Sequence, residues 1–186
     1  MSSLASMVAG EVAEACDFTN VKTIVDVGGS HGTLLSAVLR KHDHLSGIIF
    51  DLPEVAERAR KSLAAENLSA RAKAVGGDFF VDVPAGDVYL LKQVLHDWND
   101  EQCATILSLC AKRMATGGRV CIVEMVIPDD NSPSMASLMD LNMLVMLPGR
   151  ERSLKEYRRL VDSAGLRFER LLQTHSPFQI IEASKR

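Results

Sequence analysis

Apolar and polar residues follow two different spacings along this chain. Short apolar runs, typical of buried strands, end at Val25, Phe50, Leu91 and Val123. Between these runs, apolar residues recur at the three- and four-residue intervals of helices that pack on a core. Strand patterns that alternate with helical ones predict a doubly wound, mostly parallel sheet with helices on both faces.

Two further strands are predicted at residues 166–172 and 178–183, with a short turn around Pro177 between them. This connection is too short for a crossover helix, so the two strands should pair antiparallel. The predicted fold is therefore an α/β, Rossmann-like sheet that ends in an antiparallel C-terminal hairpin.

Helix boundaries carry local signals. Proline suits the first turn of a helix, and a polar residue followed three positions later by Glu or Gln forms a capping box. Such signals stand at Pro53 for a helix to about residue 66, at Asn99/Gln102 for a helix that stops before Gly117, and at Ser153/Glu156 for a helix that ends before Gly165. Residues 1–20 lead into the domain at 21–186 as one amphipathic helix, with apolar residues at helical spacing: Leu4, Met7, Val8, Val12 and Ala15.

A glycine turn follows the first strand. Residues 26–32 read DVGGSHG, and Gly28 and Gly29 permit backbone angles that are closed to other residues. The second strand ends in Asp51, whose carboxylate can accept hydrogen bonds from both hydroxyls of a ribose. The turn is neither G-x-G-x-x-G nor a phosphate loop. Asp26, two residues before the first glycine, suits a cofactor with a ribose and an amino-acid tail but no phosphates.

The segment 87–100, DVYLLKQVLHDWND, places His96 just beyond an apolar strand. Ligands of open parallel sheets bind beyond the carboxyl ends of the strands, so this histidine is well placed for chemistry. The alternative is that His96 caps the helix that begins near Asn99 and touches no ligand. Asp97 could likewise cap that helix, and Trp98 is interpreted as a packing anchor.

Six segments occur in one colinear order: DVGGSHG (26–32), FDLP (50–53), GGDFF (76–80), KQVLHDW (92–98), VEMVIPDD (123–130) and GRERSLKEY (149–157). From about residue 21 to the C-terminus the chain resembles the catalytic domain of S-adenosylmethionine-dependent O-methyltransferases of the caffeate and hydroxyindole type. The resemblance implies a seven-stranded class I methyltransferase sheet. Ser30 stands where the family usually has Gly, and its side chain is small enough to leave the pocket open.

The resemblance also implies roles for single residues. Gly28 would lie against the amino-acid end of S-adenosylmethionine and Asp51 would bind its ribose. Asp78 would accept from the adenine amino group, Phe79 would cover the ring, and Lys92 would line the same pocket. For Phe79 and its neighbour Phe80 the alternative is core packing.

Methionines at helical spacing, Met135, Met139, Met143 and Met146, offer flexible apolar surface for a flat aromatic acceptor, although such a stripe is more often core. Met143 aligns with a substrate contact of the family. Leu147 stands where plant members often carry Asn, so the acceptor should lack the polar group that Asn recognises.

Methyl transfer from a sulfonium to a hydroxyl is an in-line displacement, so the acceptor must lose its proton as the bond forms. His96 is the natural base, because an imidazole of ordinary pKa near 6.5 is largely neutral at neutral pH. Such a base needs one ring nitrogen held by a carboxylate, and Glu124 and Glu151 are the candidates. The alternatives are that Glu124 ends a strand in solvent and that Glu151 belongs to a solvated charged run, Arg150-Glu151-Arg152.

Composition narrows the classes of protein to which the chain can belong. The 186 residues suit one domain, and a net charge of −3 gives no electrostatic case for nucleic acid or an anionic membrane. The chain shows no signal peptide and no long apolar run, which predicts a cytoplasmic protein. Four cysteines without C-x-x-C spacing are expected as buried free thiols. No metal is expected, and the only metal-like cluster, His42-Asp43-His44, lies in a predicted surface turn.

Two other functions remain open at this level. A nicotinamide-dependent oxidoreductase would share the fold but needs pyrophosphate-binding glycines. A catalytically silent nucleoside-binding module would share the pocket, because a fold does not guarantee activity. In the resembling family a helical dimerisation domain precedes the first helix and is not seen here, so the chain is expected to be either a fragment of a longer, homodimeric enzyme or a stand-alone domain.

Overall fold

The computed structural model describes the backbone of residues 2–130, 132–146 and 149–186, and the side chains of 4–130, 132–140 and 149–186. The helices are α1 (Ser2–Ala15), α2 (Thr33–Lys41), α3 (Pro53–Ala65), α4 (Asp100–Arg113), α5 (Met135–Met146) and α6 (Leu154–Ser163), with a 3-10 turn η1 (Leu95–Asp97). The strands are β1 (Thr23–Val27), β2 (Ser46–Asp51), β3 (Ala72–Gly76), β4 (Gly86–Lys92), β5 (Met114–Ile127), β6 (Arg152–Ser153), β7 (Leu166–Gln173) and β8 (Phe178–Lys185).

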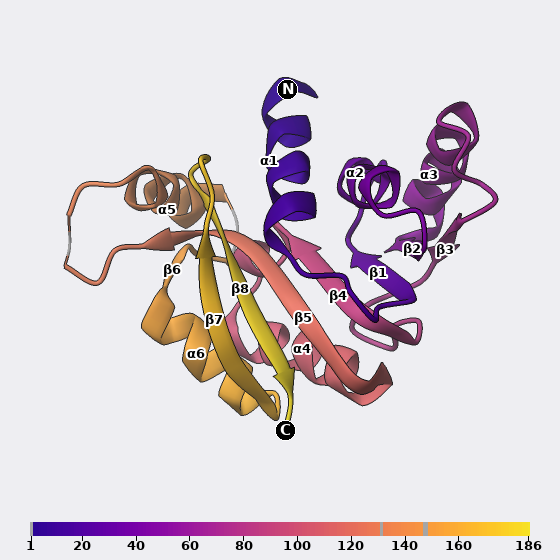
Figure 1. Ribbon diagram of the computed structural model, residues 1–186. Coiled ribbons are helices and arrows are strands. Elements are labelled where there is room, and N and C mark those ends of the chain that lie inside the picture. The colour runs from indigo at the N-terminus through magenta and orange to yellow at the C-terminus, as the bar shows by residue number, and fades with distance from the viewer. Residues whose placement is uncertain (1, 131, 147–148) are drawn as a thin grey trace.

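Seven strands lie side by side in the order β3-β2-β1-β4-β5-β8-β7 (Figure 1). The first five pair in parallel, whereas β8 pairs antiparallel with both β5 and β7. The doubly wound sheet with an antiparallel hairpin is confirmed. The two-residue β6, which no sequence pattern predicted, pairs with the end of β5 and makes an eighth strand.

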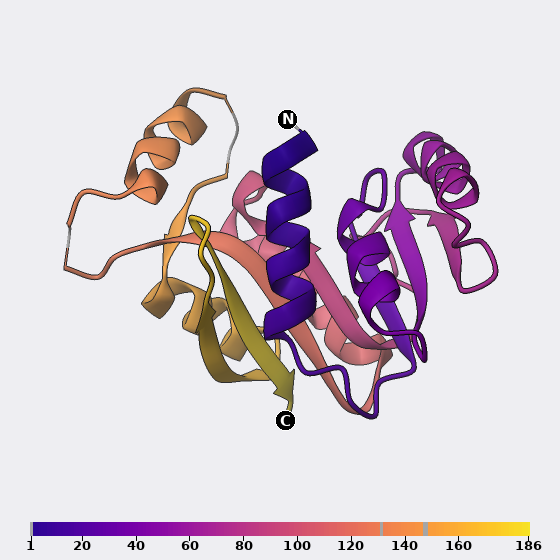
Figure 2. The same ribbon diagram turned by 45° about the horizontal axis from the view of Figure 1, so that its top comes forward.

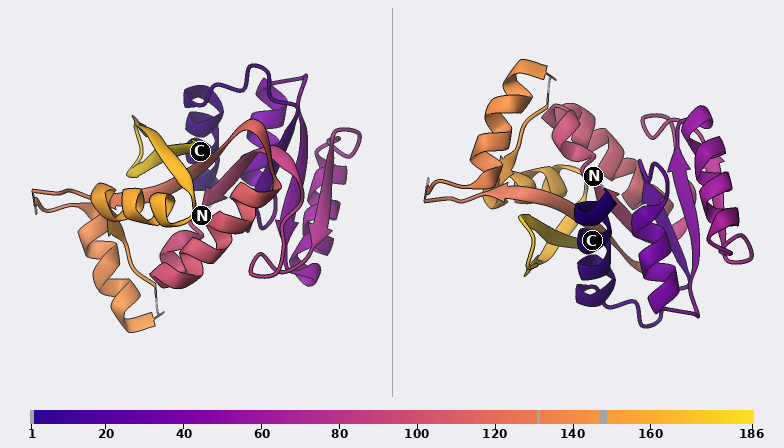
Figure 3. Two further views of the ribbon diagram at one scale, coloured as in Figure 1. Left: turned by 90° about the horizontal axis from the view of Figure 1, so that it is seen from below. Right: turned by 90° about the horizontal axis from the view of Figure 1, so that it is seen from above.

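Helices cover both faces of this sheet. On one face, α1, α2 and α3 share an apolar cluster with β1, β4, β5 and β8, and on the other face α4 and α6 pack against the same strands (Figure 3). The inner strands β1, β2 and β4 are buried on both sides, which explains their continuous apolar runs. Figure 2 shows α5 set to one side of the sheet, beyond the end of β5.

The predicted helix caps are confirmed. Asn99 Oδ1 accepts from the Gln102 amide at 3.0 Å, and the Gln102 side chain accepts from the Asn99 amide at 3.3 Å. Ser153 and Glu156 form the second capping box at the start of α6. Each box satisfies two amides that the first helical turn leaves without partners, so the boundaries are set locally.

Helix α1 buries fewer of its apolar residues than the sequence pattern predicts. Val8 and Val12 are buried, but Leu4 and Met7 keep 46% and 48% of their surface exposed. These two side chains stay exposed because the N-terminal half of α1 projects past the strand ends (Figure 1). Only the C-terminal half of the predicted apolar face lies on the sheet.

Strand β5 is longer than the run predicted at 120–123. It pairs with β8 from Arg119 to Met125, and Glu124 lies inside it with no exposed surface. The interpretation of Glu124 as a strand end in solvent is therefore wrong. All four cysteines are buried and free, as expected. Within the described ranges, no helix is long and apolar enough to cross a bilayer.

Candidate active site

The glycine turn between β1 and α2 lines a cavity of about 360 Å³, together with Asp26 at the end of β1 and Lys92 at the end of β4. Gly28 has φ +67°, and a Cβ there would stand 2.8 Å from Val94 Cγ2. A Cβ on Gly29 would stand 2.8 Å from Asp26 Cγ. The turn therefore needs glycine both for its backbone angles and for the close approach to its neighbours.

Asp26 lines this cavity and is only 2% exposed. Its Oδ2 atom has no hydrogen-bond partner among the described residues. Burial raises the pKa of Asp26 to about 7, and the hydrogen bond from the Leu35 amide and the charge of Lys92 offset it only in part. An ammonium group in the cavity could donate to the Oδ2 atom.

Asp51 ends β2 and is held across the glycine turn. Its Oδ2 accepts from the Ser30 amide at 2.9 Å, and its Oδ1 accepts from the Leu52 amide at 2.8 Å. Each carboxylate oxygen keeps a free lone pair after these bonds. Ser30 itself has φ +50°, so this residue tolerates the left-handed backbone that glycine more often adopts. The carboxylate is fixed beside the cavity and can still accept two hydroxyl groups.

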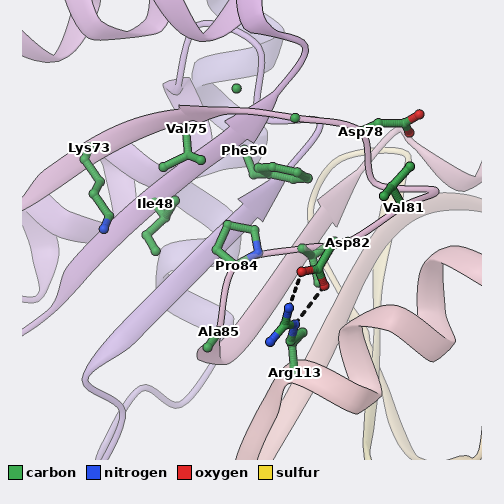
Figure 4. Close-up of a pocket in the computed structure, with 13 residues that line it drawn as sticks. Ile48, Phe50, Lys73, Val75, Asp78, Val81, Asp82, Pro84, Ala85 and Arg113 are labelled. Atoms are coloured by element: carbon green, nitrogen blue, oxygen red, sulfur yellow. Dashed lines mark hydrogen bonds and ion pairs between the residues drawn. The ribbon is translucent and has the colours of Figure 1, made fainter.

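Asp78 and Phe79 lie on the loop after β3 and are not among the residues that line this cavity. Asp78 borders a second cavity of about 530 Å³ under the same loop, but its carboxylate points away from the other lining residues (Figure 4). Phe79 makes edge contacts with Phe80 and with Trp98, at ring centroid distances of 4.9 and 6.0 Å. Both phenylalanines and Trp98 thus have packing partners, and the adenine contacts of Asp78 and Phe79 stay predictions.

Lys92 lies on the wall of the 360 Å³ cavity, and its role toward the cofactor stays a prediction. Its Nζ donates to the Gln93 side chain at 2.9 Å. Gln93 also lines the cavity, and it has φ +55° where the chain leaves β4. No sequence pattern indicated this residue, because a glutamine in the left-handed backbone region has no signature in the sequence.

Beyond β4, the 3-10 turn η1 brings His96 to two carboxylates. His96 Nδ1 lies 3.3 Å from Glu151 Oε1 and 3.5 Å from Glu124 Oε2. The imidazole is 14% exposed, while the glutamates are 3% and 0% exposed. The structure brings these three candidates together, and the interpretation of Glu151 as part of a solvated run is wrong.

Glu124 also shapes the turn that carries the histidine. Its Oε1 accepts from the amides of Val94 and Leu95 at 3.0 Å each, and that of His96 lies at 3.4 Å. Its Oε2, like Glu151 Oε2, makes no hydrogen bond among the described residues. Glu124 therefore fixes the backbone of the turn with one oxygen and faces the imidazole with the other.

Asp97 touches the histidine from the other side, with Oδ1 3.3 Å from His96 Nε2. It does not cap α4, because Asn99 does so, and His96 is no cap either. From the sequence, capping of the helix stood as the alternative to contact between Asp97 and the histidine, because the sequence does not fix the direction of neighbouring side chains in a short turn.

The pKa of His96 differs from the ordinary value that the sequence predicts. Burial lowers the pKa of His96, but the hydrogen bond with Glu151 and the charges of Glu124 and Asp97 outweigh it, so the pKa rises to about 9. Burial raises the pKa of Glu124 to about 7. The prediction of a largely neutral imidazole at neutral pH is wrong, since three carboxylates surround it.

Two clusters among the described residues could hold a metal ion: His96, Glu124 and Glu151, and the buried Cys16, Cys121 and Glu182. In the first, Glu124 Oε1 is taken by backbone amides. In the second, Glu182 is paired with Arg170 at 2.6 Å. The ring nitrogens of His42 and His44 contact the carbonyls of Ala13 and Phe18. The absence of a metal stays a prediction.

The Met-rich helix is observed as α5, but the side chain of Met143 lies outside the described residues, as does Leu147. Met135, at the start of this helix, is 53% exposed. The predicted substrate contact of Met143 therefore stays untested.

Comparison with known proteins agrees with this geometry. Residues 1–167 match the family model of the O-methyltransferase domain, so the chain belongs to that family. Phenazine O-methyltransferase PhzM of Lysobacter antibioticus is 45% identical over 177 residues, which cover 95% of this chain and 52% of that protein. The chain spans about half the length of the curated relatives it matches.

Solved structures show the same fold. LaPhzM superimposes with a TM-score of 0.94 at 43% identity, over 98% of this chain and 55% of that one. NcsB1, an O-methyltransferase of neocarzinostatin biosynthesis, superimposes with a TM-score of 0.86 at 34% identity, over 100% of this chain and 58% of that one. The NcsB1 structure contains S-adenosyl-L-homocysteine and 1,4-dihydroxy-2-naphthoic acid.

Proposed function

We propose that this domain transfers a methyl group from S-adenosylmethionine to a hydroxyl of a small aromatic acceptor, with His96 as general base. The observation that carries the proposal is the placement of His96 Nδ1 within 3.5 Å of both Glu124 and Glu151, one turn beyond a strand that lines the glycine cavity. Relatives named as methyltransferases of aromatic molecules, and the naphthoic acid in NcsB1, support the acceptor class.

The cavity residues fit the cofactor. The unpartnered Asp26 Oδ2 can accept from the ammonium group of its amino-acid tail, and the free lone pairs of Asp51 suit the two ribose hydroxyls. The turn beside the cavity depends on Gly28 and Gly29, because a Cβ at either position would come within 2.8 Å of Val94 or Asp26. When bound, S-adenosylmethionine supplies an electrophilic methyl group.

The histidine can serve as base despite its raised pKa. A phenol has a pKa near 10, so transfer of its proton to an imidazole of pKa about 9 is almost balanced in free energy. Glu151 and Glu124 hold Nδ1, so Nε2 would be the proton acceptor. Asp97 Oδ1, 3.3 Å from Nε2, would have to give way to the acceptor hydroxyl. After the transfer, the same carboxylates stabilise the imidazolium.

His96→Gln tests the proposal. Turnover should fall roughly 10²- to 10⁴-fold on a non-acidic phenol, the usual contribution of a positioned base, while affinity for S-adenosylhomocysteine stays the same. The defect should shrink for an acceptor that is already ionised. Equal turnover by wild type and His96→Gln on the non-acidic phenol would end the proposal.

A calorimetric titration with S-adenosylmethionine and with NAD separates the other functions. Binding of NAD alone would favour an oxidoreductase. Binding of S-adenosylmethionine without turnover in the intact protein, on any of a panel of phenols, would favour a silent binding module. The proposed homodimer of the full-length architecture would be measured on the same sample by sedimentation.

A further inference from the structure

Arg152 is the first residue of the two-residue strand β6 and directly follows Glu151 in the chain. Its charged side chain has no exposed surface. Its charge is compensated by Asp100, whose Oδ1 accepts from Nε at 3.0 Å and from Nη2 at 2.8 Å. Burial of an arginine is costly unless its donors are satisfied. The acceptors that these donors bind therefore indicate the role of the buried arginine.

All five N–H groups of this guanidinium have acceptors. Besides the two bonds to Asp100, Nη1 donates to the carbonyls of Leu95 at 2.8 Å and Arg150 at 3.2 Å, and Nη2 donates to the carbonyl of Trp98 at 2.7 Å. Leu95 and Trp98 stand on either side of the dipeptide His96-Asp97. The arginine thus holds both ends of the turn that carries the proposed base.

The segment around Arg152 makes two further contacts with the histidine. A Cβ on Gly149 would stand 1.8 Å from the His96 carbonyl oxygen, so the two backbones are in close approach. Glu151, between Gly149 and Arg152, reaches Nδ1 at 3.3 Å. One short segment therefore fixes the backbone of His96 and binds its ring.

We infer that Arg152 is a positioning residue for methyl transfer: its guanidinium sets the turn Leu95–Trp98 in register with the 149–152 segment, so that the His96 ring stays against Glu151. The inference rests on the proposed function. A planar fork with five donors can bridge three carbonyls and a carboxylate at once, whereas a lysine ammonium has three donors at one point and cannot span them.

Arg152→Lys in the intact protein tests this role. We expect kcat on a non-acidic phenol to fall roughly 10- to 100-fold, because misplacement of a catalytic group by about 1 Å has an effect of this size. Affinity for S-adenosylhomocysteine should stay within about twofold. The NMR titration of His96 should move toward the ordinary histidine value, because the ring loses its contact with Glu151. A residue that only stabilised the fold would leave that titration unchanged.

Arg150→Lys is the matched control. Arg150 binds the same Asp100 through Oδ2 at 3.0 Å and also Glu156, but its side chain has no bond to the turn. It should behave as wild type. If Arg152→Lys does not fold, Asp100→Asn weakens the anchor of the guanidinium at a half-exposed position and should shift both kcat and the titration in the same direction by a smaller amount.

The inference would be overturned by a folded Arg152→Lys variant with wild-type kcat and an unshifted His96 titration. If Arg152→Lys does not fold, the same result in Asp100→Asn would overturn it. The titration needs no acceptor, so it separates this inference from the proposed function. If His96→Gln turns over as fast as wild type, the function fails, whereas an unshifted titration in a folded variant removes only the positioning role.

Discussion

Glu151→Gln should lower the pKa of His96, because the hydrogen bond that Glu151 accepts from the ring is the largest of the contributions that raise it to about 9 from an ordinary value near 6.5. Glu124 at 3.5 Å and Asp97 at 3.3 Å remain in the variant. Loss of one of three carboxylates should lower the pKa by about one pH unit, or ~1.4 kcal/mol of interaction with the imidazolium. The variant should therefore titrate near pH 8.

The direct assay is an NMR titration of the His96 ring proton, assigned by its loss in His96→Gln among the five histidines. Turnover gives a second readout. Only the neutral imidazole accepts a proton, so kcat/KM should rise with pH and level off above the pKa of His96. In Glu151→Gln the midpoint should move to lower pH, while the plateau falls because the ring is held less firmly.

Glu101→Gln, an exposed glutamate in the first turn of α4, is the control for loss of one negative charge and should leave the midpoint near 9. A wild-type midpoint near 6.5 would refute the reasoning that carboxylates outweigh burial. A midpoint near 9 in Glu151→Gln would show that this glutamate does not act on the ring.

Three further outcomes follow from the structure. Asp51→Ala should weaken calorimetric binding of both S-adenosylhomocysteine and adenosine by about 1–3 kcal/mol, because ribose hydroxyls lose their acceptor, and unchanged affinity would remove Asp51 from the site. Asp26→Asn should weaken binding of S-adenosylhomocysteine but not of adenosine, since only the former carries an ammonium group; equal losses would contradict the assigned contact. The paired change Leu4→Ser and Met7→Ser should reduce self-association measured by sedimentation, because both side chains are nearly half exposed, whereas Val81→Ser, on the loop after β3, should not. A wild-type monomer at high concentration would count against this.

Much of the fold was readable from the sequence by itself, because its signals are local. Capping boxes at Asn99 and Ser153, and continuous apolar runs in strands buried on both faces, depend only on neighbouring residues and on burial. The short β6 was not readable, because a two-residue strand has no periodicity. The exposed positions of α1 were missed for another reason: an amphipathic pattern shows which face is apolar but not how far the sheet extends beneath it.

The candidate site likewise has a part that the sequence indicated and a part that only the tertiary structure decided. The glycine turn, Asp51 and His96 follow strand ends, and parallel strands bring such positions to one edge, so the sequence indicated where they would meet. The tertiary structure decided which carboxylates face the imidazole, that Asp97 joins them, and that Arg152 is buried with every donor used. It also raised the pKa of His96 rather than leaving it ordinary. These properties depend on distances between residues up to 57 positions apart in the chain, which no local pattern encodes.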